Sequence, residues 1–215
     1  MKELKKTKYW LFDLDNTLYS GDTKVFDQVD KKMSKFISEK LNVSIDEAKK
    51  IQKNYFHEYN TTLNGMIKNH DIDANEFLEF VHDVDLSFLK KDDYLKEQIS
   101  KLDGKKIIFT NGSKAHASNV TSRIGIEQLF DGVFDIVDSD FYPKPSIEPY
   151  KKIIENYKIQ PEYCIFFEDI ARNLKPAYEL GMKTVWIENN EPWAAKFSDE
   201  KFVNFKTKSL ANFLK

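Results

Sequence analysis

Apolar and polar residues follow two patterns along most of the chain, one typical of strands and one of helices. Short apolar runs that end in polar residues predict buried strands at 9–14, 106–110, 133–137, 163–167 and 184–187. Between the later runs, apolar residues at helical spacing predict helices at 116–124, 146–157 and 171–180. Gly125 and Gly181 follow two of these segments, as is common just past a helix C-terminus. Strands that alternate with helices predict an α/β fold with a parallel sheet covered on both faces.

The segment between about residues 19 and 101 has only the helical pattern. Apolar residues recur there every three or four positions, which predicts helices at 25–41, 48–59, 73–84 and 94–102. Ser44 and Glu47 form a capping-box pattern before the second of these helices, whereas the polar stretch 60–65 predicts a loop. A structureless insertion of this length is implausible in a compact domain. We therefore predict a core domain of residues 1–18 and 101–215 and a small inserted helical cap domain of residues 19–100.

Charge and cysteine content narrow the classes of protein to consider. The 215 residues include 33 Lys and Arg against 35 Asp and Glu, a net charge of −2, whereas a binder of nucleic-acid polymers would be more basic. The single cysteine, Cys164, excludes an internal disulfide framework and fits a reducing compartment. No apolar run approaches the ~20 residues of a membrane span, and the first residues lack a signal-peptide pattern. We expect a cytoplasmic protein that binds no membrane and is a monomer or weak dimer.

Polar residues follow several of the predicted strands, at the sheet edge where open parallel sheets bind ligands. They offer carboxylate, hydroxyl, amide and amine groups and a glycine turn, and they are Asp13, Asp15, Thr17, Thr110, Asn111, Gly112, Lys144, Glu168, Asp169 and Asn173. Carboxylates from two strands can hold Mg²⁺, which offsets the repulsion between a phosphate and an anionic nucleophile. One carboxylate can then attack phosphorus, while a second, two residues away, protonates the leaving alcohol and later activates water.

These residues resemble the four motifs of the haloacid dehalogenase-like hydrolase superfamily. Asp-x-Asp-x-Thr occurs at 13–17, an apolar run that ends in threonine at 107–110, the motif lysine at Lys144, and the acidic pair at Glu168 and Asp169. The resemblance covers essentially the whole chain. It implies a Rossmann-like α/β core with a helical cap, Mg²⁺ as cofactor, and a phosphomonoesterase that forms an aspartyl-phosphate.

The resemblance also implies a role for each motif residue. Asp13 is expected to be the nucleophile and a metal ligand, and Asp15 the general acid and base with its backbone carbonyl on the metal. Asp169 is expected to be a further metal ligand. The phosphate-binding residues are expected to be Thr110, Asn111, Gly112 and Lys144, of which Thr110 and Lys144 also count as catalytic. Supporting positions around the site are assigned to Glu168, Asn173 and Thr17.

A narrower resemblance links the chain to the pyrimidine 5′-nucleotidase branch of that superfamily. It rests on the strings LFDLDNTLY, FTNGSKAHA, KPSIEPYKK and FFEDIARN. The branch implies a small phosphorylated metabolite as substrate, a nucleoside 5′-monophosphate such as UMP or CMP. Gly112 stands where the branch commonly has alanine, Glu168 where it often has aspartate, and Asn173 where many relatives carry a further aspartate. We expect Asn173 to orient Asp169 or a metal-bound water.

Substrate-selecting residues are harder to identify, because specificity depends on the cap. Tyr55, Phe56 and Tyr59 offer rings on which a base can stack, although residues at helical spacing commonly form a cap's own core. Asn64 lies in the predicted loop 60–65, and His116 follows the phosphate loop, where it fits a capping or structural role as well as a substrate contact. The remaining histidines lack the spacing of zinc ligands and are interpreted as surface or cap residues: His57, His70 and His82.

Several functions share this set of residues. The same chemistry serves a phosphatase for a phosphosugar or phosphoglycolate, or a phosphomutase. A phosphate-ligand sensor on the same fold is a non-enzymatic alternative, but it would be expected to lack Asp13, Asp15 or Lys144, and all three are present. Halide-releasing relatives are disfavoured, because they lack the second acid that Asp15 supplies.

Overall fold

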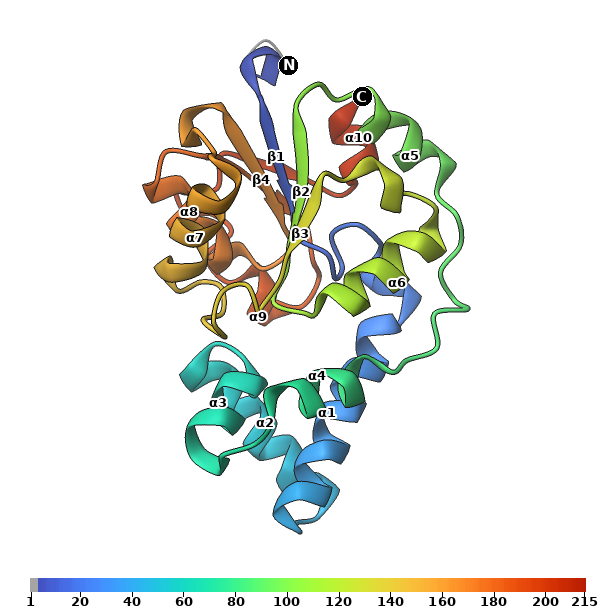
Figure 1. Ribbon diagram of the computed structural model, residues 1–215, viewed down its shortest axis with the longest axis vertical. Helices are drawn as coiled ribbons and strands as arrows, with labels where there is room; N and C mark the ends of the chain where they lie inside the picture. The colour runs from blue at the N-terminus through green and yellow to red at the C-terminus, as the bar shows by residue number, and fades with distance from the viewer. Residues whose placement is uncertain (1–3) are drawn as a thin grey trace.

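The computed structural model describes residues 4–215, which form a layered α/β core and a helical lobe next to it (Figure 1). The core contains a six-stranded sheet of order β3-β2-β1-β4-β5-β6, in which every neighbouring pair is parallel. The strands are β1 (Tyr9–Phe12), β2 (Lys105–Phe109), β3 (Gly132–Phe134), β4 (Cys164–Glu168), β5 (Lys183–Ile187) and β6 (Phe205–Thr207). The predicted α/β fold is confirmed. The sequence pattern does not predict β6, because an edge strand of three residues is too short to show a period.

Side chains that alternate along the strands pack against two helical layers. On one face, Phe12 and Phe167 pack with residues of α5, α6 and α10. On the opposite face, Leu11 and Phe166 pack with residues of α7 and α8. Complete burial of such side chains contributes roughly 1.5–3 kcal/mol each. The helices of the core are α5 (Asp93–Ser100), α6 (Lys114–Ile124), α7 (Ile147–Tyr157), α8 (Leu174–Glu179), α9 (Pro192–Ala195) and α10 (Leu210–Leu214).

Short 3-10 helices connect several of these elements. They are η1 (Leu4–Lys6), η2 (Gly21–Thr23), η3 (Glu127–Leu129), η4 (Pro161–Tyr163) and η5 (Ala171–Asn173). Two of them border the carboxyl ends of strands, since η2 follows the loop after β1 and η5 follows β4. They therefore shape the edge of the sheet at which the polar residues gather.

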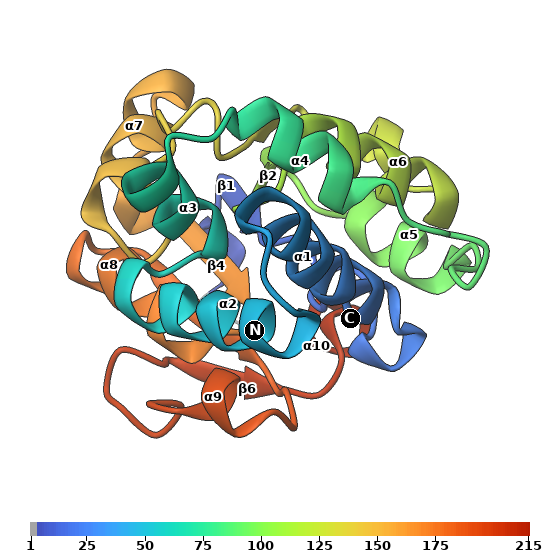
Figure 2. The same ribbon diagram turned by 90° about the horizontal axis from the view of Figure 1, so that it is seen from below.

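Four helices form a lobe opposite the carboxyl ends of the strands, and Figures 1 and 2 show it from two directions. Its apolar residues make a cluster of their own, which includes Phe36, Met66 and Phe77. The aromatic ring of Phe36 contacts that of Phe77 edge-on, with centroids 5.0 Å apart. The helices of the lobe are α1 (Val25–Leu41), α2 (Ile45–Tyr59), α3 (Thr62–His70) and α4 (Ala74–His82).

The predicted loop at 60–65 is wrong, because most of this stretch belongs to α3. Asn60 adopts a left-handed conformation (φ 69°) that ends α2, and the side chain of Thr61 accepts from the N–H of Asn64 at 3.1 Å to cap α3. Gly65 lets α3 approach α2 closely, since a Cβ there would lie 2.3 Å from Cγ of Tyr55. The polar residues that suggest a loop are therefore the caps of two helices.

The boundary between the lobe and the core lies before α5. Leu95 and Ile99 of α5 belong to the same apolar cluster as the sheet residues Phe12 and Phe167, and α5 packs next to α10. The predicted cap range 19–100 thus includes a helix that packs on the core. We propose that the cap consists of α1 to α4.

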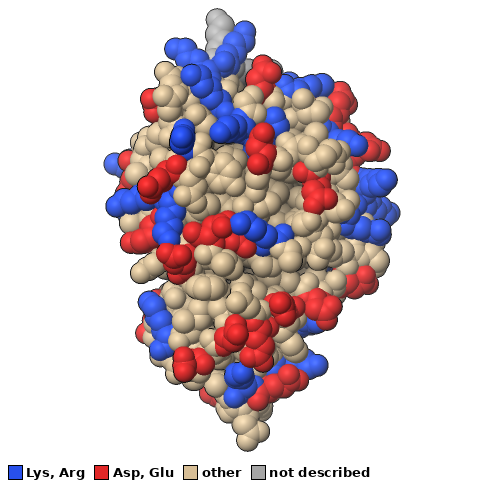
Figure 3. Space-filling view, in the orientation of Figure 1, with Lys and Arg blue, Asp and Glu red and all other residues tan. Residues whose placement is uncertain are grey.

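Two general features are the distribution of charged side chains on the surface and the character of the helices. Figure 3 shows acidic and basic side chains mixed over the visible face, without a field of one sign. Among residues 4–215, no helix has both the length and the apolar character needed to cross a membrane.

Candidate active site

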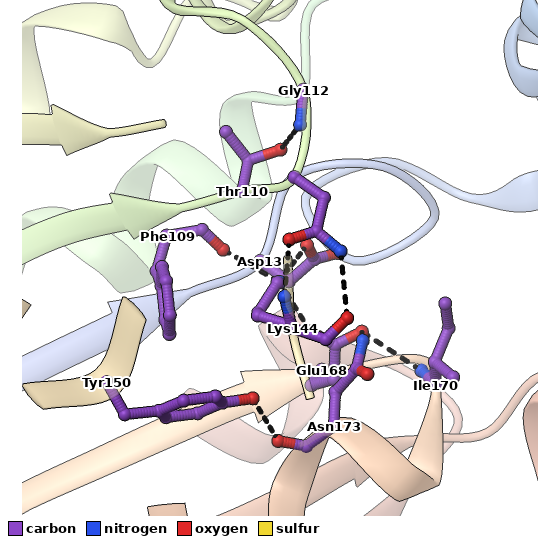
Figure 4. A network of polar contacts seen from close by, with 10 residues as sticks. Asp13, Phe109, Thr110, Gly112, Lys144, Tyr150, Glu168, Ile170 and Asn173 are labelled. Carbon is purple, nitrogen blue, oxygen red and sulfur yellow. Dashed lines mark hydrogen bonds and ion pairs between the residues drawn. The ribbon is translucent and has the colours of Figure 1, made fainter. Parts of the chain in front are cut away.

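Asp13 follows β1 directly, and the sheet fixes its position. Its backbone N–H donates to the carbonyl of Phe167 at 2.9 Å, which continues the pairing of β1 with β4 past the last strand residue. The Asp13 side chain is nearly buried, and its Oδ1 accepts a hydrogen bond from Nζ of Lys144 at 2.7 Å (Figure 4). The first motif aspartate and the motif lysine, 131 residues apart in the chain, are thus in direct contact.

Lys144 is 1% exposed and donates three hydrogen bonds. Its Nζ contacts Oδ1 of Asp13 and Oε2 of Glu168, both at 2.7 Å, and the carbonyl of Phe109 at 2.8 Å. Burial alone would lower the pKa of Lys144, but the two carboxylates raise it above its usual value. The amide of Asn111 holds the Lys144 backbone, accepting from its N–H at 2.9 Å and donating to its carbonyl at 3.3 Å. The side chain of Asn111 therefore positions Lys144.

Three carboxylates converge at the ends of β1 and β4. Asp13, Glu168 and Asp169 are all buried, and each contributes an oxygen that lies within 4.8 Å of the others. Burial and the charge of Glu168 raise the pKa of Asp13 to about 7, and burial likewise raises the pKa of Asp169. One ammonium group, that of Lys144, faces this cluster, so negative charge is left without compensation. A small hard cation fits the site, because such cations prefer carboxylate oxygens and would supply the missing charge.

Amide groups hold the two acids that follow β4. Glu168 Oε1 accepts from the side-chain amide of Asn173 at 3.1 Å and from the N–H of Ile170 at 3.2 Å. Asp169 Oδ2 accepts instead from the amide of Asn189 at 2.7 Å. Asn173 thus contacts Glu168 and not Asp169, because its amide faces back along the loop toward the end of β4. The sequence analysis did not identify Asn189, since nothing in its local sequence marks it.

The carboxylate of Asp15 has different surroundings from that of Asp13. Its Oδ1 accepts from the hydroxyl of Tyr19 at 2.5 Å and from Nε2 of His116 at 2.9 Å. Burial by itself would raise the pKa of Asp15, but His116 and Tyr19 together lower it to about 2. In the metal-free protein, two aspartates only two positions apart therefore have pKa values shifted in opposite directions.

His116 is buried, and its ring faces a histidine of the cap. The rings of His116 and His82 are stacked, with centroids 4.4 Å apart and planes 12° apart. Nδ1 of His82 also lies 3.0 Å from the hydroxyl of Ser113, which caps α6. His116 therefore bonds to Asp15 and packs against the cap. His82, interpreted from sequence as a surface or cap residue, comes from the cap helix α4 but reaches the core.

The turn after β2 brings a hydroxyl and a glycine to the same place. Oγ1 of Thr110 accepts from the N–H of Gly112 at 2.9 Å. A Cβ at position 112 would lie 3.3 Å from Oγ1 of Thr110 and 3.5 Å from Nε2 of His82, so glycine is suited to this tight turn. Thr17 is buried next to the first motif, and its Oγ1 has no hydrogen-bond partner among the described residues.

A cavity of about 450 Å³ joins the strand ends to the cap. From the core it is lined by residues of all four motifs, including Asp13, Thr110, Lys144 and Asp169. From the cap it is lined mainly by α1, α2 and α4, which contribute apolar residues with a few polar ones. Residues of all four motifs therefore line the same cavity, and the cap forms its opposite wall.

The proposed substrate-selecting residues of the cap are placed elsewhere. Among the described residues, the cavity lining includes none of Tyr55, Tyr59 and Asn64. The Tyr55 hydroxyl bonds to Nε2 of His70 at 2.6 Å, and the amide of Asn64 donates to the carbonyl of Tyr59 at 2.9 Å, so these groups are used inside the cap. Of the three aromatic residues considered for base stacking, the lining includes Phe56, and it also includes two residues that the sequence analysis did not select: Arg172 and Trp193.

Comparison with known proteins agrees with this geometry. The family described as haloacid dehalogenase-like hydrolase matches residues 7–181. Phosphate metabolism protein 8 of Saccharomyces cerevisiae is 32% identical over 197 residues, which are 81% of this chain and 60% of the yeast protein. The chain therefore spans about three-fifths of the length of that relative.

Two further proteins match over almost their whole length. Glyceraldehyde 3-phosphate phosphatase of Methanocaldococcus jannaschii is 24% identical over 216 residues, covering 93% of this chain and 92% of that protein. Among solved structures, a haloacid dehalogenase-family hydrolase of Bacillus subtilis bound to magnesium is 18% identical, with a TM-score of 0.59 and 97% of each chain covered. At that identity the likeness concerns the fold.

Proposed function

The chain belongs to the haloacid dehalogenase-like hydrolase family, and from this premise we propose that it is a Mg²⁺-dependent phosphomonoesterase that acts on nucleoside 5′-monophosphates. The observation that carries the proposal is the pair of aspartates at the end of β1. Asp13 contacts Lys144 and faces Glu168 and Asp169, whereas Asp15 contacts Tyr19 and His116. An anionic nucleophile such as Asp13 needs cations near it that attract the phosphate. A residue that carries a proton, such as Asp15, needs neighbours that can form hydrogen bonds with it.

The metal would be held by the cluster of Asp13, Glu168 and Asp169, and the family resemblance adds the backbone carbonyl of Asp15. When bound, Mg²⁺ would neutralise charge on the phosphoryl oxygens and on the nucleophile. The magnesium in the structure of the Bacillus subtilis hydrolase supports this choice of ion. Glu168, assigned from sequence to a supporting position, becomes a proposed ligand because its carboxylate faces the other two.

In the first step, a carboxylate oxygen of Asp13 attacks phosphorus, and the bond from phosphorus to the leaving oxygen breaks. Asp15 gives its proton to that oxygen, so the product alcohol leaves neutral. The hydroxyl of Thr110 would donate to a phosphoryl oxygen, and Lys144 and the N–H of Gly112 in the turn at 111–112 would each exchange a present hydrogen bond for one to the phosphate. The product of this step is an aspartyl-phosphate on Asp13.

In the second step, Asp15 takes a proton from a water molecule, which attacks the aspartyl-phosphate. The oxygen–phosphorus bond to Asp13 breaks, inorganic phosphate leaves, and Asp15 is again protonated. The pKa of about 2 makes Asp15 a carboxylate in the substrate-free protein, which suits the base. An incoming phosphate anion would raise the pKa of Asp15 by like-charge repulsion. Asp15 would therefore take up a proton when the ester binds, give it to the leaving oxygen, and release the proton gained from water after phosphate leaves.

The proposed substrate class rests on the resemblance to pyrimidine 5′-nucleotidases and on the cavity, which extends from Asp13 to Phe56 and Trp193. A triose phosphate is the second candidate, because the Methanocaldococcus jannaschii relative is named for glyceraldehyde 3-phosphate. Phosphate release from UMP, CMP, AMP, glyceraldehyde 3-phosphate, phosphoglycolate and phenyl phosphate, with and without Mg²⁺, tests both. Hydrolysis that needs Mg²⁺ and is fastest for nucleotides is expected. Activity on none of these esters would contradict the proposal.

A further inference from the structure

The two arginines of the chain, Arg123 and Arg172, have opposite surroundings. Nε of Arg123 donates to the carbonyls of Leu86 and Leu89 at 3.2 and 3.1 Å, and its Nη2 donates to the carbonyl of Ser87 at 3.2 Å. Arg123 therefore ties the segment before α5 to the end of α6. Arg172 has no hydrogen bond or ion pair to any residue in the range 4–215, and its Nε is fully buried without a partner. A buried guanidinium N–H without a partner is costly, so its donors call for an acceptor outside the protein.

Aromatic residues fix the orientation of Arg172. Its Cζ lies 4.6 Å from the ring centroid of Phe56, and the ring of Phe56 meets that of Trp193 edge-on at 5.3 Å. Phe56 comes from α2 of the cap, Trp193 from α9 and Arg172 from η5 of the core. All three residues line the cavity. A guanidinium held over a ring can still donate hydrogen bonds in its own plane to a ligand in the cavity.

We propose that Arg172 binds the leaving group of the substrate, through two neighbouring acceptor atoms of that group. This inference rests on the proposed function, since it concerns the part of the phosphate ester that the enzyme releases. An arginine fork matches a pair of adjacent acceptors, which single N–H donors or a lysine do not match as well. The carbonyl oxygen and the unprotonated ring nitrogen N3 of cytosine form such a pair, and so does the carboxylate of phosphoglycolate.

The position of Arg172 separates this role from phosphate binding. The reacting phosphorus must lie at Asp13, where Lys144, Thr110 and the turn at 111–112 supply donors. Arg172 instead lies against Phe56, at the boundary between the core and the cap. The cap contributes both apolar and polar residues to the cavity, and Phe26, Val29 and Met33 of α1 form an apolar part of its wall. A planar group with one polar edge would cover the apolar wall and satisfy the guanidinium.

The test compares substrates with and without acceptors in the leaving group. CMP and phosphoglycolate each carry the proposed acceptor pair, whereas phenyl phosphate carries none. For each of these two esters, the value of kcat/KM in the presence of Mg²⁺ is divided by the value for phenyl phosphate. This ratio is then compared between the wild type and Arg172→Gln. We expect the ratio for the preferred substrate to fall roughly 10- to 100-fold, as for loss of a charge-assisted hydrogen bond. Which of the two ratios falls identifies the source of the acceptor pair.

Two further variants control for charge and folding. Arg172→Lys keeps the charge without the fork, so its ratio should lie between those of the wild type and Arg172→Gln. Arg123→Gln should lower the unfolding temperature without changing the ratio, because Arg123 contacts only backbone carbonyls. An equal loss on all three esters in Arg172→Gln, or an unchanged ratio, would overturn the proposal.

Binding separates this inference from the proposed function. Titration calorimetry measures the affinity of CMP, phosphoglycolate and inorganic phosphate for the wild type and for Arg172→Gln. If the wild type binds an acceptor-bearing ester without hydrolysing any ester, the proposed function fails, while weaker binding by Arg172→Gln still supports the role of Arg172. If binding of inorganic phosphate falls as much as binding of the ester, Arg172 contacts the phosphoryl group and the inference is wrong.

Discussion

The strand ends and the cap-facing wall of the cavity differ in how completely their polar groups are used. At the strand ends, Lys144 donates three hydrogen bonds and the acids Glu168 and Asp169 are held by side-chain amides. On the other wall, the guanidinium of Arg172 contacts the ring of Phe56 and makes no hydrogen bond or ion pair within residues 4–215, although the charge of Glu168 acts on it. A fully bonded site keeps its geometry before substrate arrives, which suits the chemical step. Free donors suit recognition, because the ligand supplies their partners.

This difference separates the residues proposed for the chemical step from those proposed to select the substrate. The strand-end residues follow directly from β1, β2 and β4, so the parallel sheet places them together regardless of the cap. The recognition wall, formed by Phe56, Arg172 and Trp193, requires contact between α2 and α9. Changes in the cap can therefore alter this wall without moving Asp13. The predictions below test whether chemistry and selection separate in this way.

Asp13→Asn should cause the largest change. It removes the proposed nucleophile, so turnover of every ester should fall by roughly four orders of magnitude or more. Because an asparagine fills the same space, the protein should stay folded and still bind phosphate esters. Single-turnover assays with phenyl phosphate and circular dichroism measure the two effects. Mg²⁺-dependent turnover near the wild-type rate would show that the strand-end region does not supply the nucleophile.

Lys144→Ala should be the most destabilising of the changes considered, because it leaves the buried carboxylates of Asp13 and Glu168 without a cation. Loss of one partner from a buried ion pair costs about 3–5 kcal/mol. Urea denaturation without metal measures the free energy of unfolding. Lys101→Ala is the matched control, since Lys101 pairs with Glu97 on an exposed helix face, and its loss should cost less than about 1 kcal/mol. Equal costs for the two variants would mean that the strand-end site is not tightly bonded.

The strand-end site could be predicted from the sequence because each motif is local. Asp13, Lys144 and Asp169 each follow a recognisable run, and a parallel sheet brings such positions to one edge. The sequence analysis assigned the wrong secondary structure where a helix cap or a turn interrupts the apolar pattern. The apolar run at 133–137 ends as β3 at Phe134, because the carboxylate of Asp135 accepts from the N–H groups of residues 137 and 138 and forms a turn.

The recognition wall could not be predicted in the same way. Phe56, Arg172 and Trp193 lie in three distant segments, and their contact depends on how the cap docks on the core. The neighbours of Asp15 show the same limit. Nothing local predicts that Tyr19 and His82 lie near Asp15, because Tyr19 lies two residues past the first motif and His82 belongs to a cap helix. Contacts that form only when the cap docks on the core cannot be inferred from local sequence patterns.

A pH titration of metal-free protein should show that the strand ends hold excess negative charge. Burial and Glu168 raise the pKa of Asp13 from 3.8 to about 7, so between these values the folded state binds a proton more tightly than the unfolded state. The stabilisation is fully present below about pH 4 and is lost as the pH rises through about 7. We expect the wild type to lose stability relative to Asp13→Asn over this range.

Magnesium should oppose that loss. At a concentration 100 times its dissociation constant, a bound ion raises the free energy of unfolding by about 2.7 kcal/mol. Unfolding temperatures at pH 7.5 with and without Mg²⁺ measure the effect in the wild type and in Asp169→Asn, which lacks one proposed ligand. The same rise in both proteins would argue against a metal at the strand ends.

Thr61→Ala should cause the smallest change, and it tests the cap alone. Its side chain caps α3 by accepting from the N–H of Asn64, and loss of such a cap costs about 1 kcal/mol. Because α3 packs on α2 through Gly65 and Tyr55, the change loosens the helix that carries Phe56 without touching Asp13 or Lys144. Urea denaturation should show the loss of stability, and kcat/KM for phenyl phosphate should stay within about twofold of the wild type, since a capping loss of this size leaves most of the cap folded. A large loss on phenyl phosphate would mean that the cap takes part in the chemical step, and chemistry and selection would then not be separable.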